Sequence, residues 1–197
     1  MILYGASGHA KVIIDILIKN NININTVIDD NSNIKKLLNF PVKELQNTII
    51  NEDIIISIGD NSIRKKISNI LKNITYGIAI HPKSIIDKTA VINNGTVIMA
   101  NAIINSSASI GKHSIINTNA VIEHDCNIHD FVHISPSATL CGNVTVGEGT
   151  HIGAGVTIIP NIKIGKWCTV GAGSVVIKDI PDNTTIVGNP AKPIKQQ

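Results

Sequence analysis

Hydrophobic residues recur at every sixth position through the second half of the chain. Each sixth residue from Ile86 to Val176 is Ile, Leu or Val, without an exception. The residue four places after each of these anchors is usually small or β-branched. A fixed short period of this kind predicts a solenoid, in which every hexad supplies one short strand and one corner. We expect the anchor to point into the solenoid and the small residue to let the chain turn beside it.

Three such hexads complete one coil of a triangular prism, and successive coils would stack at about 4.8 Å, the spacing of parallel strands. No insertion breaks the period between Ile86 and Ile180, a length of about five coils. This hexapeptide repeat predicts a left-handed parallel β-helix over residues 81–197. The tail at residues 188–192 leaves the repeat, and we expect it to cap the prism.

Residues 1–80 alternate between strand-like and helix-like patterns instead. Apolar strands are predicted at residues 1–4, 26–28 and 53–58, and helical spacing of apolar residues at 9–19 and 61–71. This alternation predicts a small α/β, Rossmann-like domain with a parallel sheet. A glycine-containing turn after the first strand can present backbone N–H groups and a helix N-terminus to a phosphate. Plain turn geometry is the alternative explanation of these glycines.

The composition of the chain argues against nucleic acid and membrane as binding partners. Charged residues make up 16% of the chain and the net charge is +3, without the cluster of Lys and Arg that nucleic acid requires. No apolar run approaches the length of a membrane span. The three cysteines form no C-x-x-C pair, and the N-terminus lacks a signal-peptide pattern. We expect a cytoplasmic protein that binds neither nucleic acid nor membrane.

The two halves together resemble one family, the bacterial acetyltransferases that modify nucleotide-linked amino sugars for glycans. This group includes the bacillosamine-pathway and perosamine N-acetyltransferases and the sialic acid O-acetyltransferases. The resemblance covers essentially the whole chain. It is carried by GASGHA at 5–10, Asp29-Asp30, IHP at 80–82, EHDC at 123–126, LCGN at 140–143 and GNPAK at 188–192. Ser7 and Ala10 stand where the family usually has glycines.

The resemblance implies an enzyme that uses acetyl-CoA as its co-substrate, needs no metal and works as a homotrimer. It implies that acetyl-CoA lies along the groove between neighbouring prisms. The sugar-nucleotide site is implied to comprise Ser7, Gly8, His9, Asp29, Asp30 and Gly59, with Asn117 as a further substrate contact. The contacts to acetyl-CoA are implied to come from His133, Gly142, Ala154 and Ala172.

His124 is the candidate catalytic base. Acetylation of an amine needs a group that removes a proton as nitrogen attacks the thioester, and histidine suits this near neutral pH. The resemblance assigns Asp125 as the acid that supports His124, and Glu123 is a local competitor. In a regular strand both acids would lie on the face opposite His124, so only a break at the corner would bring either to the ring. A surface histidine without a role is the alternative.

Gly142 lies one coil after His124, so it should stack almost directly on it, roughly 5 Å away. A glycine there would leave room for an acyl group, and its N–H could bind the thioester oxygen. It is otherwise a common corner residue. His151 would stack on His133 in the same way, and this pair could be a plain surface ladder. Cys126 occupies a small corner position, which indicates packing rather than a nucleophile.

Two other functions compete. Left-handed β-helix carbonic anhydrases of the γ type bind zinc through histidines, and His124 and His129 share the spacing of one such pair. The position of the third ligand is Lys88 here, whereas a catalytic zinc needs three protein ligands. A non-enzymatic scaffold or nucleotide sensor is the other candidate. Within the favoured class, a UDP-linked 4-amino sugar is the first choice of acceptor, followed by GDP- or dTDP-linked amino sugars and by O-acetylation of sialic acid.

Overall fold

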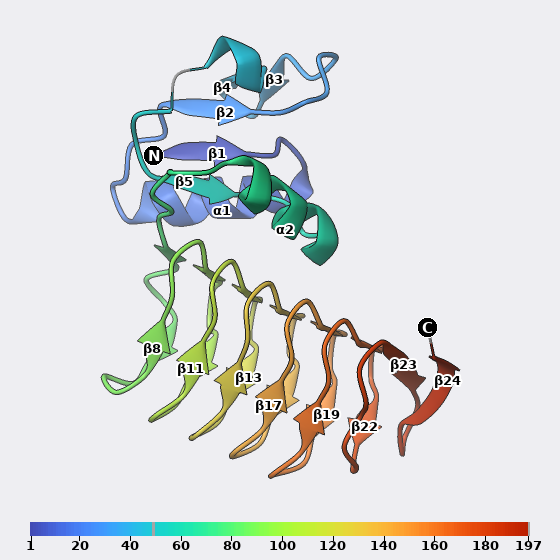
Figure 1. Cartoon of the computed structure of the whole chain (residues 1–197). Coiled ribbons are helices and arrows are strands. Elements are labelled where there is room, and N and C mark those ends of the chain that lie inside the picture. The colour runs from blue at the N-terminus through green and yellow to red at the C-terminus, as the bar shows by residue number, and fades with distance from the viewer. Residues whose placement is uncertain (49, 197) are drawn as a thin grey trace.

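The computed structural model describes residues 1–48 and 50–196, which form an α/β part and a β-solenoid (Figure 1). The α/β part is built on a sheet of strand order β3-β4-β2-β1-β5, in which all neighbours are parallel except β3 and β4. Its strands are β1 (Ile2–Tyr4), β2 (Thr26–Ile28), β3 (Lys36–Leu37), β4 (Phe40–Lys43) and β5 (Ile54–Ile56). The strands predicted at the first, second and last of these places are present.

Helices cover both faces of this sheet. Helix α1 (Gly8–Lys19) packs on the face that carries Leu3, Val27 and Ile55. Helix α2 (Asn61–Ile70) packs on the other face through Ile67. A short 3-10 helix η1 (Leu45–Asn47) follows β4. The two predicted helices are therefore present, and the arrangement is the three-layer one expected for alternating strands and helices.

The solenoid has three faces, and on each of them the neighbouring strands of the coils before the C-terminal cap run parallel and are eighteen residues apart. The first face comprises β7 (Ile85–Ile86), β10 (Ile103–Ile104), β13 (Val121–Ile122), β16 (Thr139–Leu140), β19 (Thr157–Ile158) and β22 (Val175–Val176). The second face comprises β8 (Val91–Ile92), β11 (Ser109–Ile110), β14 (Asn127–Ile128), β17 (Thr145–Val146) and β20 (Lys163–Ile164).

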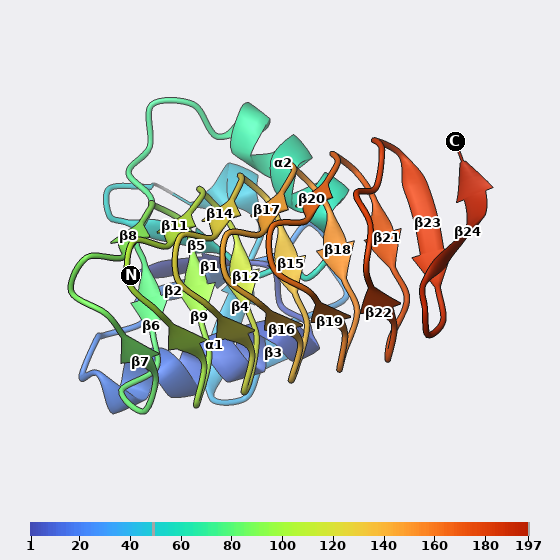
Figure 2. The ribbon, with the colours of Figure 1, turned by 90° about the horizontal axis from the view of Figure 1, so that it is seen from below.

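The third face carries the cap as well as the coils. Its strands are β6 (Ala79–Ile80), β9 (Val97–Ile98), β12 (Ile115–Ile116), β15 (His133–Ile134), β18 (His151–Ile152), β21 (Thr169–Val170), β23 (Thr184–Val187) and β24 (Lys192–Gln196). Strand β24 pairs antiparallel with β23 and closes the open edge, as expected for the tail. The predicted left-handed parallel β-helix is thus confirmed, and its coils are seen along the prism in Figure 2.

The corners differ in one detail from the prediction. Every sixth residue from 95 to 173 has a φ between +54° and +77°, the left-handed region. The chain therefore turns at the residue before the small one, and the small residue is buried inside the corner, as at Ala102, Ala120 and Ala138. Asn, Asp and Gly suit such corners because they adopt left-handed backbone at low cost. The anchors fill the core, where those from Ile98 to Val176 are all buried.

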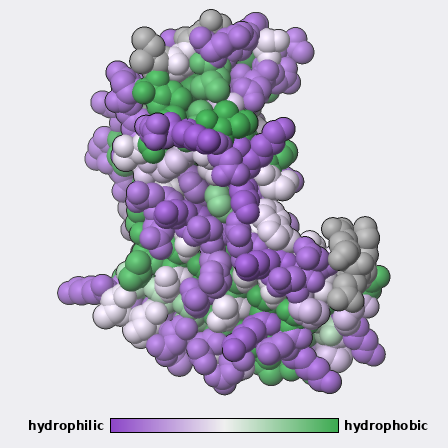
Figure 3. All heavy atoms as spheres, viewed as in Figure 1, coloured by the Kyte–Doolittle hydropathy of each residue, from purple (hydrophilic) through white to green (hydrophobic). Residues whose placement is uncertain are grey.

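The α/β part rests on the third face of the solenoid. Buried residues of α1, such as Ile13 and Leu17, share one apolar cluster with Val97 and Ile115 of that face. Figure 3 shows a hollow on this side, where the α/β part leaves the later coils uncovered. The edge between the first and second faces is therefore the one farthest from α1. We call it the far edge, and it includes residues 123–126 and 141–144.

Candidate active site

His124 stands on the far edge, between β13 and β14, with 59% of its side chain exposed. Its Nδ1 lies 2.7 Å from Oδ2 of Asp125. Asp125 is a corner residue with a φ of +60°, and this left-handed turn breaks the alternation that would have sent its side chain the other way. The sequence left Glu123 as a competitor, but Glu123 Oε2 accepts a hydrogen bond from Asn105 Nδ2 at 2.9 Å, one coil earlier.

The pairing fixes the tautomer of His124. An ionised carboxylate accepts hydrogen bonds and donates none, so Nδ1 carries the proton in this pair. Nε2 of a neutral His124 then keeps its lone pair and can accept a proton from a substrate. The exposed ring is therefore oriented by Asp125 and free to act as a base.

Gly142 lies against the His124 ring as the eighteen-residue period predicts. A Cβ placed on Gly142 would be 2.6 Å from both Cε1 and Nε2 of His124, closer than any real contact. Among the described residues the N–H of Gly142 has no hydrogen-bond acceptor, whereas Asn143 N–H donates to the carbonyl of His124. The far edge thus brings together an exposed imidazole, a carboxylate bonded to it and a backbone N–H without an acceptor among the described residues.

Cys126 is packed in the corner below this group. It is 1% exposed, and its Sγ donates to the carbonyl of Cys141 at 3.2 Å. Burial raises the pKa of the Cys126 thiol, which disfavours the thiolate that a nucleophile requires. Its position agrees with the packing role read from the sequence.

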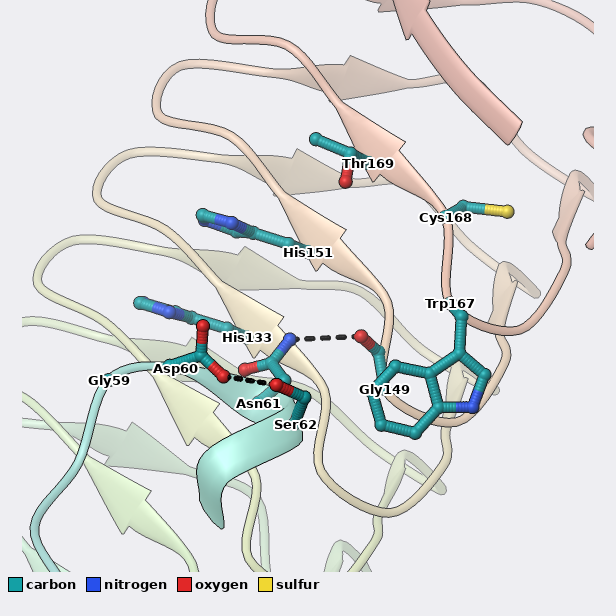
Figure 4. A pocket seen from close by; sticks show the side chains of 10 residues that line it. All are labelled: Gly59, Asp60, Asn61, Ser62, His133, Gly149, His151, Trp167, Cys168 and Thr169. Carbon is teal, nitrogen blue, oxygen red and sulfur yellow. Dashed lines mark hydrogen bonds between the residues drawn. The ribbon is translucent and has the colours of Figure 1, made fainter. Parts of the chain in front are cut away.

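A second group of the predicted residues lines a pocket of about 540 Å³ on the third face. Figure 4 shows His133, His151 and Thr169 side by side on consecutive strands, facing the start of α2 at residues 59–62. The rings of His133 and His151 stack with their centroids 4.8 Å apart. The stacked pair expected from the repeat is therefore present, and it forms part of a pocket wall.

His133 is held neutral in this wall. Burial, reinforced by the positive charge of Arg64, lowers the pKa of His133 to about 3. Its Nε2 is 3.0 Å from Nδ2 of Asn117. An amide N–H donates, so Nε2 of the neutral ring accepts from Asn117. Asn117 and His133, two of the predicted contacts, are thus bonded to each other, and Gly59, a third, lines the pocket beside His133.

The N-terminal turn leaves a helix end open. Ser7 is the N-cap of α1, but its side chain caps no backbone N–H. A Cβ on Gly8 would meet nothing within 4 Å, so the backbone there is accessible. His9 follows in the first turn, where burial lowers its pKa to about 4, and its Nε2 has no partner among the described residues. Ser7 and Gly8 are placed as a phosphate-binding helix end would require.

Asp29 and Asp30 are already engaged with the protein. Asp29 accepts the N–H of Ala6 at 2.7 Å and the N–H of Asn31 at 2.8 Å, one on each carboxylate oxygen. Asp30 is exposed and accepts the hydroxyl of Tyr4 at 2.7 Å through Oδ1, which leaves Oδ2 without a bond among the described residues. Asp29 therefore ties the turn to β2, and Asp30 is the freer of the two acids.

Ala154 and Ala172 occupy equivalent corners between the third and first faces, one coil apart. Both residues are exposed. The carbonyl of Ala154 accepts from Gly173, but neither alanine N–H has an acceptor in the described part of the chain. These two N–H groups are available to a ligand, and they lie on a different edge from His124.

The structure thus divides the predicted residues between separate edges and faces of one chain. His124, Asp125 and Gly142 share the far edge, whereas His133, Asn117 and Gly59 share the third face. Sequence reasoning missed the other residues of the pocket, which are Asp60, Asn61, Ser62, Gly149, Trp167, Cys168 and Thr169. The period could have found Thr169, since it follows His133 and His151 at the same spacing. No comparable sequence pattern predicts that residues 60–62 line the pocket.

Within residues 1–48 and 50–196, no three His, Cys, Asp or Glu side chains are grouped as a metal ion would require. None of the helices in this described part is long and apolar enough to cross a membrane.

Family models match both parts of the chain. The model described as the PglD N-terminal domain matches residues 1–71. The model of the bacterial transferase hexapeptide (six repeats) matches residues 125–159 and 143–178. An uncharacterized protein of Acanthamoeba polyphaga mimivirus is 32% identical over 96 residues, and the match spans 47% of this chain but a fifth of that relative.

Solved structures match over nearly the full length. A variant of perosamine N-acetyltransferase from Caulobacter crescentus, in complex with CoA and GDP-perosamine, is 32% identical with a TM-score of 0.92, covering 98% of this chain and 96% of that one. The acetyltransferase domain of PglB from Neisseria gonorrhoeae FA1090 is 34% identical with a TM-score of 0.92, covering 98% of both chains. WeeI from Acinetobacter baumannii AYE is 27% identical with a TM-score of 0.90, also covering 98% of both.

The β-helix of hexapeptide repeats places the chain among the acyltransferases, which the matching family model and solved structures represent. The full-length matches are more specific, because they include the α/β part as well as the coils. The chain belongs to the family of hexapeptide-repeat sugar acetyltransferases that carry a PglD-type N-terminal domain. It is therefore an enzyme, which removes the scaffold alternative.

Proposed function

We propose that this enzyme transfers the acetyl group of acetyl-CoA to the 4-amino group of a nucleotide-linked amino sugar in glycan biosynthesis. The observation that carries the proposal is the His124–Asp125 pair, 2.7 Å apart and lying against Gly142. A UDP-linked sugar is our first choice, and the GDP-perosamine bound by a relative supports the class of acceptor while making GDP the main rival.

The geometry supports direct transfer without an acetyl-enzyme. The neutral amine nitrogen attacks the thioester carbonyl as Nε2 of His124 accepts its proton, and Asp125 stabilises the imidazolium. The N–H of Gly142 donates to the carbonyl oxygen as negative charge develops there. The carbon–sulfur bond then breaks, and the sulfur leaves with the bonding pair and takes the proton from His124. Cys126, two residues after His124, is buried and takes no part.

We propose that the working unit is a homotrimer with composite sites. The far edge is exposed, and the other predicted contacts of the same chain lie on other faces. A neighbouring copy would bring its third face to the far edge and exclude water from the thioester. In this arrangement Ala154 and Ala172 offer their N–H groups to acetyl-CoA along the groove, together with His133. The expected mass in light scattering is three times that of the 21.0 kDa chain.

We assign the acceptor to the α/β part. The open helix end at Ser7 and Gly8 would receive phosphate, while Asp30 would accept from the ribose or base. His9, Asp29 and Gly59 would shape the site around them, with Asn117 contacting the sugar. A cytoplasmic location accords with the three cysteines, which are all free thiols, because structural disulfides are rare in a reducing compartment.

The test is the release of free CoA with a panel of acceptors. The panel comprises UDP-, GDP- and dTDP-linked amino sugars, together with sialic acid. His124→Ala should lower kcat by about 10²–10⁴-fold, the usual effect of losing a general base, while acetyl-CoA still binds. His129→Ala is the control, because His129 is an exposed histidine outside the group. Release with sialic acid alone would favour O-acetylation, and an inactive panel would refute the proposal.

A further inference from the structure

Arg64, in the first half of α2, is a buried cation. It is 1% exposed, and it is absent from the ion pairs found among the described residues. A guanidinium has five N–H donors, and all five are satisfied here. The acceptors are the carbonyls of His113, Ile58, Gly59 and Phe131 and the side-chain oxygen of Asn61, at 2.7–3.1 Å. Burial accordingly lowers the pKa of Arg64 to about 9.

These acceptors belong to the two separate parts of the molecule. The carbonyls of His113 and Phe131 lie one coil apart on the edge between the second and third faces of the solenoid. The carbonyls of Ile58 and Gly59 lie in the loop between β5 and α2. The planar guanidinium therefore joins a rigid edge of the prism to a loop that has no secondary structure of its own.

This loop forms part of the pocket on the third face. Gly59 lines the pocket, and its carbonyl accepts from Arg64 Nη1 at 3.1 Å, while the adjacent carbonyl of Ile58 accepts from the same nitrogen at 2.9 Å. A Cβ on Gly59 would meet nothing within 4 Å, so the backbone there has open space beside it. The two hydrogen bonds from Arg64 tie residues 58 and 59 to the buried guanidinium.

We propose that Arg64 is a positioning residue for the acceptor, holding the Gly59 loop against the solenoid so that the acceptor side of the pocket is preformed. The inference rests on the proposed function only in assigning this pocket to the acceptor. Arg64 does not itself line the pocket, and it acts through its hydrogen bonds to Gly59 and Asn61, which do. A preformed pocket lowers the ordering cost of binding, so its loss raises KM for the ligand concerned.

A neighbouring contact provides the matched control. Lys65, the next residue of α2, forms an ion pair with Glu148 and lies over the Trp167 ring, 5.2 Å from its centroid. This contact also joins α2 to the solenoid, but Glu148 does not line the pocket, and its carboxylate pairs with Lys65 and not with the Gly59 loop. Glu148→Gln therefore weakens the junction between the two parts and leaves the Gly59 loop in place.

The experiment compares Arg64→Lys, Arg64→Met and Glu148→Gln with the wild type. Lysine keeps the charge but has three donors, so it cannot reach both carbonyl pairs. We expect Arg64→Lys to raise the acceptor KM by about tenfold or more, the effect of losing a hydrogen bond from a charged group, with KM for acetyl-CoA unchanged. Amide hydrogen exchange should accelerate at residues 57–61 in Arg64→Lys and stay at the wild-type rate in Glu148→Gln.

The outcomes separate the two hypotheses. An unchanged acceptor KM, an equal rise in both KM values, or unchanged exchange at residues 57–61 would overturn the positioning role. If Arg64→Met fails to fold, Arg64→Lys decides the question alone. If the wild type turns over no amino sugar nucleotide, the proposed function fails. The exchange rates and the calorimetric affinity for UDP and GDP then judge the role of Arg64 independently.

Discussion

Substituting Gly142 by alanine tests the far edge more sharply than removing the base. The added Cβ would be 2.6 Å from Nε2 and Cε1 of His124, whereas ordinary contact begins at 3.4 Å. The backbone of Gly142 is outside the left-handed region, so alanine fits its conformation. The imidazole is the movable partner and must recede by about 1 Å, a displacement that can cost 10²-fold in rate.

We expect Gly142→Ala to lower kcat by about 10²-fold without loss of stability, because a tolerated Gly-to-Ala change stabilises by about 0.4–1 kcal/mol. The assay is steady-state CoA release, accompanied by thermal unfolding. Alanine keeps the N–H at position 142, so the donor to the thioester oxygen is retained and the loss reports on His124.

The control is the double variant with His124→Ala. If Gly142→Ala acts by displacing the base, it should have almost no effect once the base is absent, since residues that act as a unit are not additive. A full 10²-fold loss in both backgrounds would refute this reasoning, and so would a Gly142→Ala enzyme with wild-type kcat.

Three further predictions follow from the described contacts. Asp30→Ala should raise the acceptor KM and leave KM for acetyl-CoA unchanged. Tyr4→Phe, which spares the carboxylate, should change neither value. A rise in both KM values for Asp30→Ala would mean that the α/β part has a structural role and does not bind the acceptor. Cys126→Ser should keep most activity in the CoA assay, because the buried thiol is not a nucleophile, and burst kinetics with an acetylated enzyme would contradict this. Stability should fall as the pH drops from about 6.5 to 5, because His9 and His133 have folded pKa values of about 4 and 3 and the unfolded chain takes up the protons first. A melting temperature constant over that window would be incompatible with buried neutral histidines.

The fold was predictable wherever the pattern repeats. Sixteen anchors at a period of six leave one solution for the solenoid, and the stacking of Gly142 on His124 and of His151 on His133 follows from arithmetic. The left-handed turn at the corners was a weaker signal: nine of the fourteen corner positions from 95 to 173 are Asn, Asp or Gly, but His113, Phe131 and Trp167 interrupt that pattern.

The pocket on the third face could be predicted only in part, and the reason differs from that for the corners. Its wall of His133, His151 and Thr169 is periodic, but its other side comes from residues 59–62, which are held by hydrogen bonds from the side chains of Arg64 and Asn61 to backbone carbonyls. Arg64 reads in the sequence as an ordinary polar residue of an amphipathic helix. A side chain whose partners are backbone carbonyls from distant segments leaves no pattern in the residues around those carbonyls.

Because each coil takes eighteen residues, the number of coils sets the length of the solenoid. Removing one whole coil beyond β17 would keep His124, Asp125 and Gly142 in register and shorten the prism by about 4.8 Å. Removing six or twelve residues would keep the anchors inside but move every later column to a neighbouring face, and any other number would turn the anchors outward. The length of the prism beyond His124, Asp125 and Gly142 can therefore change only by whole coils. A molecule that lies along this edge meets a surface whose length varies in steps of one coil.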